Sequence, residues 1–337
     1  MEVKQRTAKS LVSRLGSVSD NTRADALREL RLSTKHDPDI RPILAECGAV
    51  PYLSETLYSN SHDLQENAAA SLLNLSISSK HDLLSSPGLL DSVSHVLRHH
   101  SSSSSPAAVQ SCSALLHSLL IVDTLRPIIG SKRDIVYSLI DILKSHNAPP
   151  RSVKDALKAL FGISLYPLNR ATAIQLGIAP VLFNLTVREG RVGILEDTTA
   201  VIAQVAGCEE ASEEFAKVSG VRLLVDLIDI GTGLSMRIKE NAVSGLLNLA
   251  RCGGETVVEE IRKWCLAESG FGVLEGISEV TENGTEKGKG KAAELLKIVD
   301  SEFPRIVGSG SESECGSSSG VDLSENHRFV YLTFDSS

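Results

Sequence analysis

The amino-acid sequence predicts an all-α solenoid of about six three-helix repeats, with helical caps at its ends. First, one motif recurs, because residues 65–76 and 239–250 share Glu-Asn-Ala and Leu-Leu-Asn-Leu at the same spacing. Second, weaker copies of the motif lie between them, at 109–120, 153–165 and 196–206. Third, aromatic residues make up only 4% of the chain, while aliphatic residues recur at helical spacing, which suits thin layers of packed helices. Since one such unit cannot bury its apolar face alone, neighbouring units must stack into a continuous core.

Glycines mark the predicted boundaries between units. They recur at intervals of about forty residues, each after a short helical stretch, at Gly48, Gly88, Gly130, Gly177, Gly220 and Gly270. A glycine ends a helix at low cost because it adopts the left-handed conformation without a Cβ clash. Pro51 and Pro180 follow three residues after a glycine, where the next helix can begin with proline at its first position. One unit is therefore predicted to be a short helix, a second helix and a longer third helix.

The chain is predicted to divide into three parts. Residues 1–20 form an N-terminal capping helix, residues 21–303 form the repeat array, and residues 304–337 form a disordered tail rich in serine, glycine and acidic residues. Units of the array start near residues 22, 48, 88, 130, 177 and 220, and two terminal helices over 271–302, separated by a polar turn at 281–285, close the apolar end. The third unit carries an insertion at the serine run 101–105.

Composition excludes several classes of function. A net charge of −8 argues against a protein that binds nucleic acid directly, which would show a clustered basic surface. No apolar run reaches 18 residues, so we expect no membrane span. The first residues lack the apolar segment of a secretory signal, and the six cysteines are scattered without a C-x-x-C pair. We therefore expect reduced thiols and a cytoplasmic or nuclear location, or both.

No pattern in the chain predicts catalysis, a cofactor or a metal. Serine and glutamate are abundant, but nothing gathers a nucleophile, a base and an acid at fixed offsets. His99 and His100 have no third ligand at useful spacing. The glycine–lysine stretch at 284–291 lacks the spacing and the Ser/Thr that a phosphate-binding loop requires.

Several stretches resemble the armadillo region of the plant U-box/armadillo proteins. They are residues 45–53, 65–68, 72–77, 129–131 and 154–161, and the resemblance covers about residues 1–303. The resemblance implies an armadillo-type right-handed superhelical solenoid. In that family the armadillo array recruits targets or signalling partners, while an N-terminal U-box engages the ubiquitin-conjugating enzyme.

No segment of this chain reads as a U-box, so the ligase role has no residue to carry it. We therefore expect a monomeric, non-catalytic scaffold that binds other proteins through a concave groove, in a setting of ubiquitination or plant signalling. The alternative is the substrate-binding part of a U-box E3 ubiquitin ligase whose U-box is missing from this sequence. A U-box encoded in frame upstream of Met1 would favour that alternative.

The resemblance implies that the third helix of each unit lines the groove, where an asparagine near its end can bond the backbone of a bound peptide. An amide offers both a donor and an acceptor, as a peptide unit does. That position holds Arg31, Asn74, His117, Gly162, Gln204 and Asn248. The candidate groove residues are Arg31, Asn67, Asn74, His117, Lys158, Gln204, Asn241 and Asn248.

Only two of those six positions hold asparagine, so a long peptide held evenly along the groove is not expected. Two interpretations stay open for Asn74 and Asn248: contact with a partner, or bonds to neighbouring helices that hold the stack together. His117 has two as well, a groove residue that titrates near neutrality or a packing residue.

Nuclear-import adaptors, which are also armadillo arrays, are the rival binding class. They place a tryptophan four residues before each groove asparagine, to sandwich lysine side chains. Here those positions hold Leu27, Ala70, Ser113, Lys158, Ala200 and Ser244. Import-signal binding is therefore disfavoured, as is an adhesion-type adaptor, and Trp264 is expected in the core.

Overall fold

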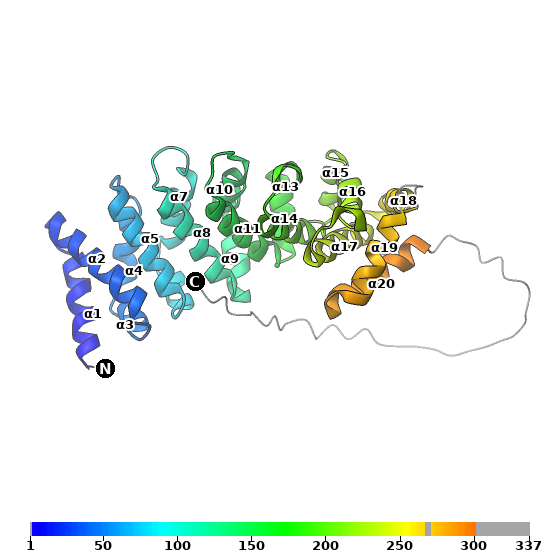
Figure 1. Cartoon of the computed structure of the whole chain (residues 1–337). Helices are drawn as coiled ribbons and strands as arrows, with labels where there is room; N and C mark the ends of the chain where they lie inside the picture. Colours follow the sequence, from blue (N-terminus) through cyan, green and yellow to red (C-terminus); the bar gives the residue numbers. More distant parts are fainter. Residues whose placement is uncertain (1, 267–270, 301–337) are drawn as a thin grey trace, which may run out of the picture. The chain divides into compact units, whose positions relative to one another are not determined.

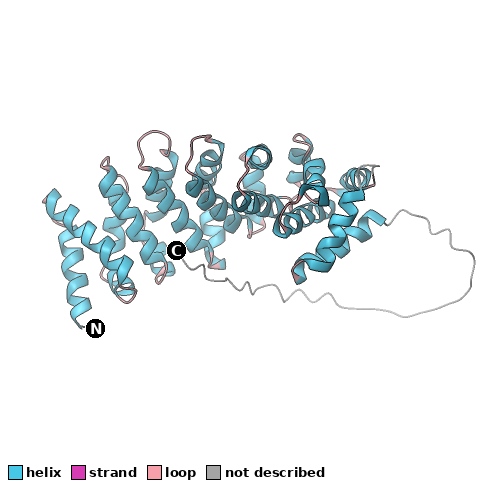
Figure 2. Cartoon of the chain, viewed as in Figure 1, coloured by secondary structure: helices cyan, strands magenta, loops and turns pink. Residues whose placement is uncertain are grey.

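The computed structural model describes residues 2–266 and 271–300 (Figure 1). That part is built of α-helices and two short 3-10 helices joined by turns and loops, and no strand occurs in it (Figure 2). The predicted all-α class is therefore confirmed. Gly270 and the predicted tail 304–337 lie outside the described residues. The helices are α1 (Glu2–Leu15), α2 (Asp20–His36), α3 (Ile40–Glu46), α4 (Ala49–Thr56), α5 (His62–Ser76), α6 (Lys80–Ser85), α7 (Leu89–Arg98), α8 (Pro106–Leu120), η1 (Asp123–Leu125), α9 (Arg126–Gly130), α10 (Arg133–Lys144), α11 (Pro150–Ser164), α12 (Leu168–Gln175), α13 (Ile178–Arg188), α14 (Val192–Val205), α15 (Glu210–Ala216), α16 (Gly220–Asp226), η2 (Ile230–Thr232), α17 (Met236–Cys252), α18 (Gly254–Cys265), α19 (Phe271–Asn283) and α20 (Glu286–Asp300).

The longest helices form a consecutive stack. Each of α2, α5, α8, α11, α14, α17 and α20 packs against the next one in that order, which Figure 1 shows as a row of neighbouring helices. Between them the shorter helices come in pairs, so that α1 and α2 are followed by six three-helix units, from α3–α5 to α18–α20, in the described residues. The copies of the recurring motif lie on five of these helices, α5, α8, α11, α14 and α17.

The core is continuous along the stack. One cluster of buried apolar side chains extends from Ala8 on α1 to Val299 on α20, and almost all of its members are aliphatic. Phe183 and Phe215 form an aromatic pair within it, with ring centroids 4.9 Å apart in an edge-to-face arrangement. Since each unit buries its apolar face only against its neighbours, the helices depend on the stack for stability.

The glycine prediction is correct at three described boundaries. Gly48, Gly88 and Gly177 have φ values of 86°, 81° and 79°, and each directly precedes the second helix of its unit. The prediction is wrong at Gly220, which is the first residue of α16, because Ser219 takes the left-handed conformation there with φ 53°.

The prediction is also wrong at Gly130, which ends α9 without a positive φ. Its lack of a side chain has a packing reason instead. A Cβ at Gly130 would lie 2.1 Å from Nδ2 of the buried Asn169, which donates hydrogen bonds to the carbonyls of Arg126 (3.0 Å) and Ile163 (2.9 Å). Glycine is needed here for close approach between units.

Pro51 and Pro180 are the third residues of α4 and α13, so the predicted first position is wrong by two residues. Both helices begin directly after their glycine. Since the first four N–H groups of a helix have no intrahelical acceptor, proline is tolerated in this first turn as well.

The terminal helices differ from prediction in three ways. α19 continues to Asn283 and α20 begins at Glu286, so most of the predicted turn at 281–285 is helical. Glu240 of α17 supports the short connection, because its carboxylate accepts hydrogen bonds from the backbone and the hydroxyl of Thr285. In addition, α18 precedes this pair, so the end of the array is a complete three-helix unit.

Trp264 on α18 is half-buried, and the Arg222 guanidinium lies 4.9 Å from the centre of its ring.

Three arginines join successive units at the ends of the long helices. Nε of Arg41 donates to the Thr34 carbonyl (2.7 Å), Nε of Arg126 to that of Leu120 (3.1 Å), and Nε of Arg170 to that of Ser164 (2.9 Å). The last carbonyls of a helix have no intrahelical donor, so each arginine satisfies a group that helix geometry leaves unpaired.

Among the described residues, no single helix is both long enough and apolar enough to cross a membrane. Two sharply bent helix pairs, 106–130 and 168–188, pass a test of length and composition alone.

Candidate protein-binding face

Side chains of the long helices α2, α5, α8, α11, α14 and α17 form one surface, which we call the long-helix face. Each helix contributes three residues to it. One is at the position predicted to hold the groove asparagine, which we call the ladder position (Arg31, Asn74, His117, Gly162, Gln204 and Asn248), and the other two are four and seven residues before it. All eight predicted site residues belong to this face, spread over α2, α5, α8, α11, α14 and α17. They form a series along the stack rather than one cluster.

Asn67 and Arg31 bond to each other across two units. Nη1 of Arg31 donates to Oδ1 of Asn67 (2.9 Å), while Nδ2 of Asn67 donates to the Asp63 carbonyl (2.7 Å). Asn67 is buried, so its amide serves the α2–α5 contact. The hydrogen bonds of Asn67 therefore favour a structural role for this residue.

Asn74 and Asn248 each bond the preceding long helix through their amide nitrogen. Nδ2 of Asn74 donates to Oγ1 of Thr34 (3.1 Å), and Nδ2 of Asn248 donates to the Ala203 carbonyl (2.8 Å). Both side chains are half-buried, and among the described residues no hydrogen bond reaches either Oδ1 atom. The amide nitrogen holds the stack together, and the amide oxygen keeps its capacity to accept a hydrogen bond.

Asn241 makes the same kind of contact two helical turns earlier. Its Nδ2 donates to the Glu196 carbonyl and to Oγ1 of Thr199, both at 3.1 Å. Together with Asn248 it places two amides between α14 and α17. The contact between α14 and α17 is therefore held by amide hydrogen bonds at two positions of α17, which lie two turns apart.

His117 lies half-buried on α8. Burial lowers the pKa of its imidazole to about 4, and the nearby Lys158 ammonium acts in the same direction. The interpretation as a group that titrates near neutrality is therefore wrong, and His117 is a neutral residue at pH 7.

The ladder is interrupted between His117 and Asn248 for two different reasons. A Cβ at Gly162 would lie 2.8 Å from Cβ of Leu120, so glycine allows α8 and α11 to approach each other. At the next position Oε1 of Gln204 accepts a bond from Nη2 of Arg170 (3.4 Å). Nη1 of the same guanidinium donates to the Gly207 carbonyl (3.1 Å). Gln204 is thus engaged by the neighbouring unit.

Sequence reasoning missed two carboxylates on this face, Asp155 and Asp197. Burial raises the pKa of both, although the lysines of α11 act in the opposite direction. Both stand seven residues before a ladder position, the interval that separates Asn67 from Asn74. That interval could have identified them.

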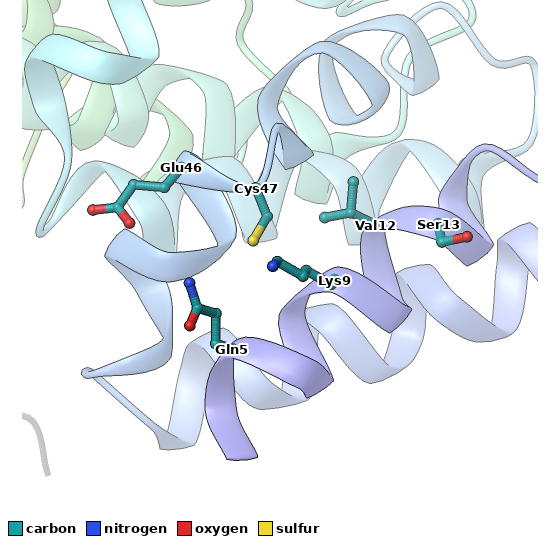
Figure 3. Close-up of a pocket in the computed structure, with 6 residues that line it drawn as sticks. All are labelled: Gln5, Lys9, Val12, Ser13, Glu46 and Cys47. Carbon is teal, nitrogen blue, oxygen red and sulfur yellow. The ribbon is translucent and has the colours of Figure 1, made fainter. Parts of the chain in front are cut away.

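Two clefts lie away from the long-helix face. One, of about 510 Å³, is formed by α1 and α3, and Figure 3 shows the Lys9 amine and the Cys47 thiol pointing toward its interior. The other, of about 270 Å³, lies between α10 and α13 and includes Lys144, His146 and Arg188. Among the described residues, no group of three or more His, Cys, Asp or Glu side chains could hold a metal ion.

Comparison with known proteins gives a consistent result. The family model described as "Plant U-box protein ARM repeat region" matches residues 7–309. The chain is 28% identical to U-box domain-containing protein 18 of Arabidopsis thaliana, over 90% of this chain and 42% of that protein. It is 29% identical to U-box domain-containing protein 8 of the same plant (82% and 72%), and 31% identical to U-box domain-containing protein 4 of Oryza sativa subsp. japonica (92% and 41%). The chain thus spans about two fifths of the length of two of these three relatives.

Solved structures show the same fold. An engineered protein superposes with a TM-score of 0.73 at 19% identity, over 87% of this chain and 68% of that one. A second engineered protein gives a TM-score of 0.61 at 20% identity, over 73% and 97%. At these identities the likeness concerns the fold alone.

Proposed function

Because this chain belongs to the ARM repeat region family of plant U-box proteins, we propose that it is a non-catalytic scaffold that binds a partner protein along its long-helix face. The observation that carries the proposal is the pair of ladder asparagines. Their amide nitrogens bond within the stack, while their oxygens keep an acceptor for a partner. A backbone N–H of an extended segment is the donor that such an acceptor fits without regard to side chain.

The partner is held at separate points in this proposal. Asn74 and Asn248 lie toward opposite ends of the ladder, and between them Gly162 offers no side chain while Gln204 already bonds Arg170. Two short contacts therefore fit this face better than one long peptide bound at every unit. We further propose that the chain acts as a monomer in the cytoplasm or nucleus, in keeping with the free thiols of its described cysteines.

A second candidate function is the substrate-binding part of a U-box E3 ubiquitin ligase. It is favoured by the relatives, which are named for a U-box domain and are mostly much longer than this chain. The same face would then hold the substrate. An in-frame U-box upstream of Met1 in the transcript would support this candidate.

Affinity purification tests the scaffold proposal. The full chain and an Asn74→Ala/Asn248→Ala variant would be expressed at equal levels, and the proteins that co-purify would be compared. We expect partners to be lost from the variant. Asn184→Ala is the matched control, because Asn184 is an exposed amide on α13, away from the long-helix face.

Circular dichroism must first show that both variants are folded. If a folded double variant retained every partner at the level of the Asn184→Ala control, binding along the ladder would be refuted, and the asparagines would be purely structural.

A further inference from the structure

Two lysines stand out at the centre of the long-helix face. Lys154 and Lys158 lie one turn apart on α11 and are both half-buried. Lys158 is the only charged side chain in its row, where the other units carry Leu27, Ala70, Ser113, Ala200 and Ser244. Among the described residues, neither ammonium has a carboxylate oxygen within 4.0 Å. Like charges one turn apart repel each other, so this pair is stabilised when an anion binds between them.

The two ammonium groups lie where three long helices meet. Nζ of Lys154 reaches the start of α14, since a Cβ on Gly193 would be 3.2 Å from it. Lys158 lies close enough to His117 of α8 to lower the pKa of that imidazole. The side chains next to Lys158 in the same row, Ser113 and Ala200, are small and buried.

The nearby acids lie beyond ion-pair distance of these two lysines. Burial raises the pKa of Asp155 even though Lys158, Arg151 and a hydrogen bond with Gln110 act against it. Burial likewise raises the pKa of Asp197, although Lys154, Lys158 and the Arg237 guanidinium, 3.9 Å away, act against it. Glu196 also lies near Arg237, at 3.7 Å, and accepts a hydrogen bond from Ser235. Asp155 and Asp197 thus lie within the electrostatic influence of the two lysines, but within residues 2–266 and 271–300 neither ammonium forms an ion pair with a carboxylate oxygen.

We propose that Lys154 and Lys158 together bind a carboxylate side chain, an Asp or Glu, in an extended segment of the partner protein. The inference rests on the proposed function, because it gives the chemistry of a segment lying on the same face. A carboxylate fits better than a phosphate, since Asp155 and Asp197 nearby would repel the second negative charge of a phosphate dianion. A basic segment does not fit, because Arg151, Lys154 and Lys158 would be the first charges that it meets.

Peptide selection tests this inference without a known partner. The full chain would be immobilised and used to select binders from a phage-displayed library of random dodecapeptides. We expect the binders to carry Asp or Glu at one fixed position, and replacing that residue by Gln or Asn to weaken binding about tenfold. The Lys154→Glu/Lys158→Glu variant is expected to lose these binders and to select Lys or Arg at the same position instead. Lys217→Glu is the control for a charge reversal elsewhere on the chain, because Lys217 is an exposed residue just after α15 paired with Glu213 and Glu214.

The outcomes separate this inference from the proposed function. Binders that need Asn74 and Asn248 but bind equally to the double-lysine variant would overturn the inference and leave the proposed function intact. Binders that are indifferent to the asparagines, or no binders at all, would count against both. A synthetic version of the best binder with phosphoserine in place of the acidic residue separates the two anions. Tighter binding of that peptide would show that the site is built for phosphate, which contradicts the carboxylate proposal.

Discussion

At the residue scale, the proposed function gives single polar side chains on the long-helix face two tasks, a hydrogen bond within the stack and one to a partner. Asn248 illustrates this, because its nitrogen ties α17 to α14 while its oxygen faces no protein donor among the described residues. Removal of such a side chain is therefore expected to lower the stability of the fold as well as any binding. Effects on binding must therefore be read against a stability measurement for the same variant.

Replacing Asn248 by alanine is expected to destabilise the fold by about 1–3 kcal/mol, because the Ala203 carbonyl loses its donor in a partly buried place. Asn248→Asp should be at least as costly, since it sets a carboxylate oxygen against that carbonyl. Urea denaturation followed by circular dichroism measures both. Asn184→Ala should change stability by less than about 0.5 kcal/mol. An Asn248→Ala chain as stable as this control would contradict the assignment.

Protonation of His117 is expected to weaken the fold in acid. Its folded pKa of about 4 lies below the ordinary value of 6.5, so the unfolded chain binds more protons between these two pH values. The stability contribution is complete above pH 6.5 and is lost as the pH falls toward 4, by up to about 3 kcal/mol. The raised pKa values of Asp155 and Asp197 act in the opposite direction, so a variant is needed to isolate the imidazole.

The measurement for His117 compares urea denaturation of the native chain and of His117→Gln at pH 7 and pH 4.5. The native chain should lose more stability than the variant over this interval. An equal loss in the two chains would mean that His117 is not buried as described.

At the element scale, the ends of the long helices decide how one unit is joined to the next. Arg170 is the most extensive of these joints, since Nε bonds the Ser164 carbonyl at the end of α11 and Nη1 bonds the Gly207 carbonyl just after α14. One guanidinium thus satisfies carbonyls at the ends of two successive long helices. The corresponding short helix of the following unit, α15, has Glu209 and Glu210 at its start, so this joint depends on the arginine of the preceding unit.

Removal of the Arg170 side chain should lower the free energy of unfolding substantially. Arg170→Ala is expected to cost about 1.5–3 kcal/mol, because hydrogen bonds from a charged donor to otherwise unpaired carbonyls are lost. Arg170→Lys should recover only part of this, since one ammonium cannot reach both helix ends. Denaturation midpoints of the two variants would be compared with Arg6→Ala, which removes only an exposed pair with Glu2. Full recovery by lysine would argue against the two-helix joint.

The helices that contain a copy of the recurring sequence motif could be predicted from the sequence. The copies at 65–76 and 239–250 fall within α5 and α17, and the glycines before α4, α7 and α13 take the predicted left-handed conformation. α18 was missed because residues 254–265 contain no copy of the motif. At Gly130 the reason for glycine is a contact with Asn169, thirty-nine positions away, which local spacing cannot reveal.

At the scale of the whole molecule, the candidate binding face could be predicted only in part. The ladder positions follow from the repeat, and all of them lie on the long helices. Their hydrogen bonds do not follow from the repeat, since Asn67 bonds Asp63 within its own helix while Asn248 bonds a carbonyl of the preceding long helix. The depressed pKa of His117 and the lysine pair on α11 depend on burial between helices, which the sequence alone does not determine.

Because the long helices stack consecutively, a rotation at the contact between two of them displaces every helix beyond that contact. Asn74 and Asn248 belong to helices separated by α8, α11 and α14, so the span between them is the sum of four joints. A small change of angle at one joint is multiplied by the length of array beyond it. A substitution at a buried joint residue such as Gly162 or Arg170 can therefore alter the distance between the two asparagines while leaving both side chains in place. In the proposed function, the choice of partner can in this way change through residues that no partner ever touches.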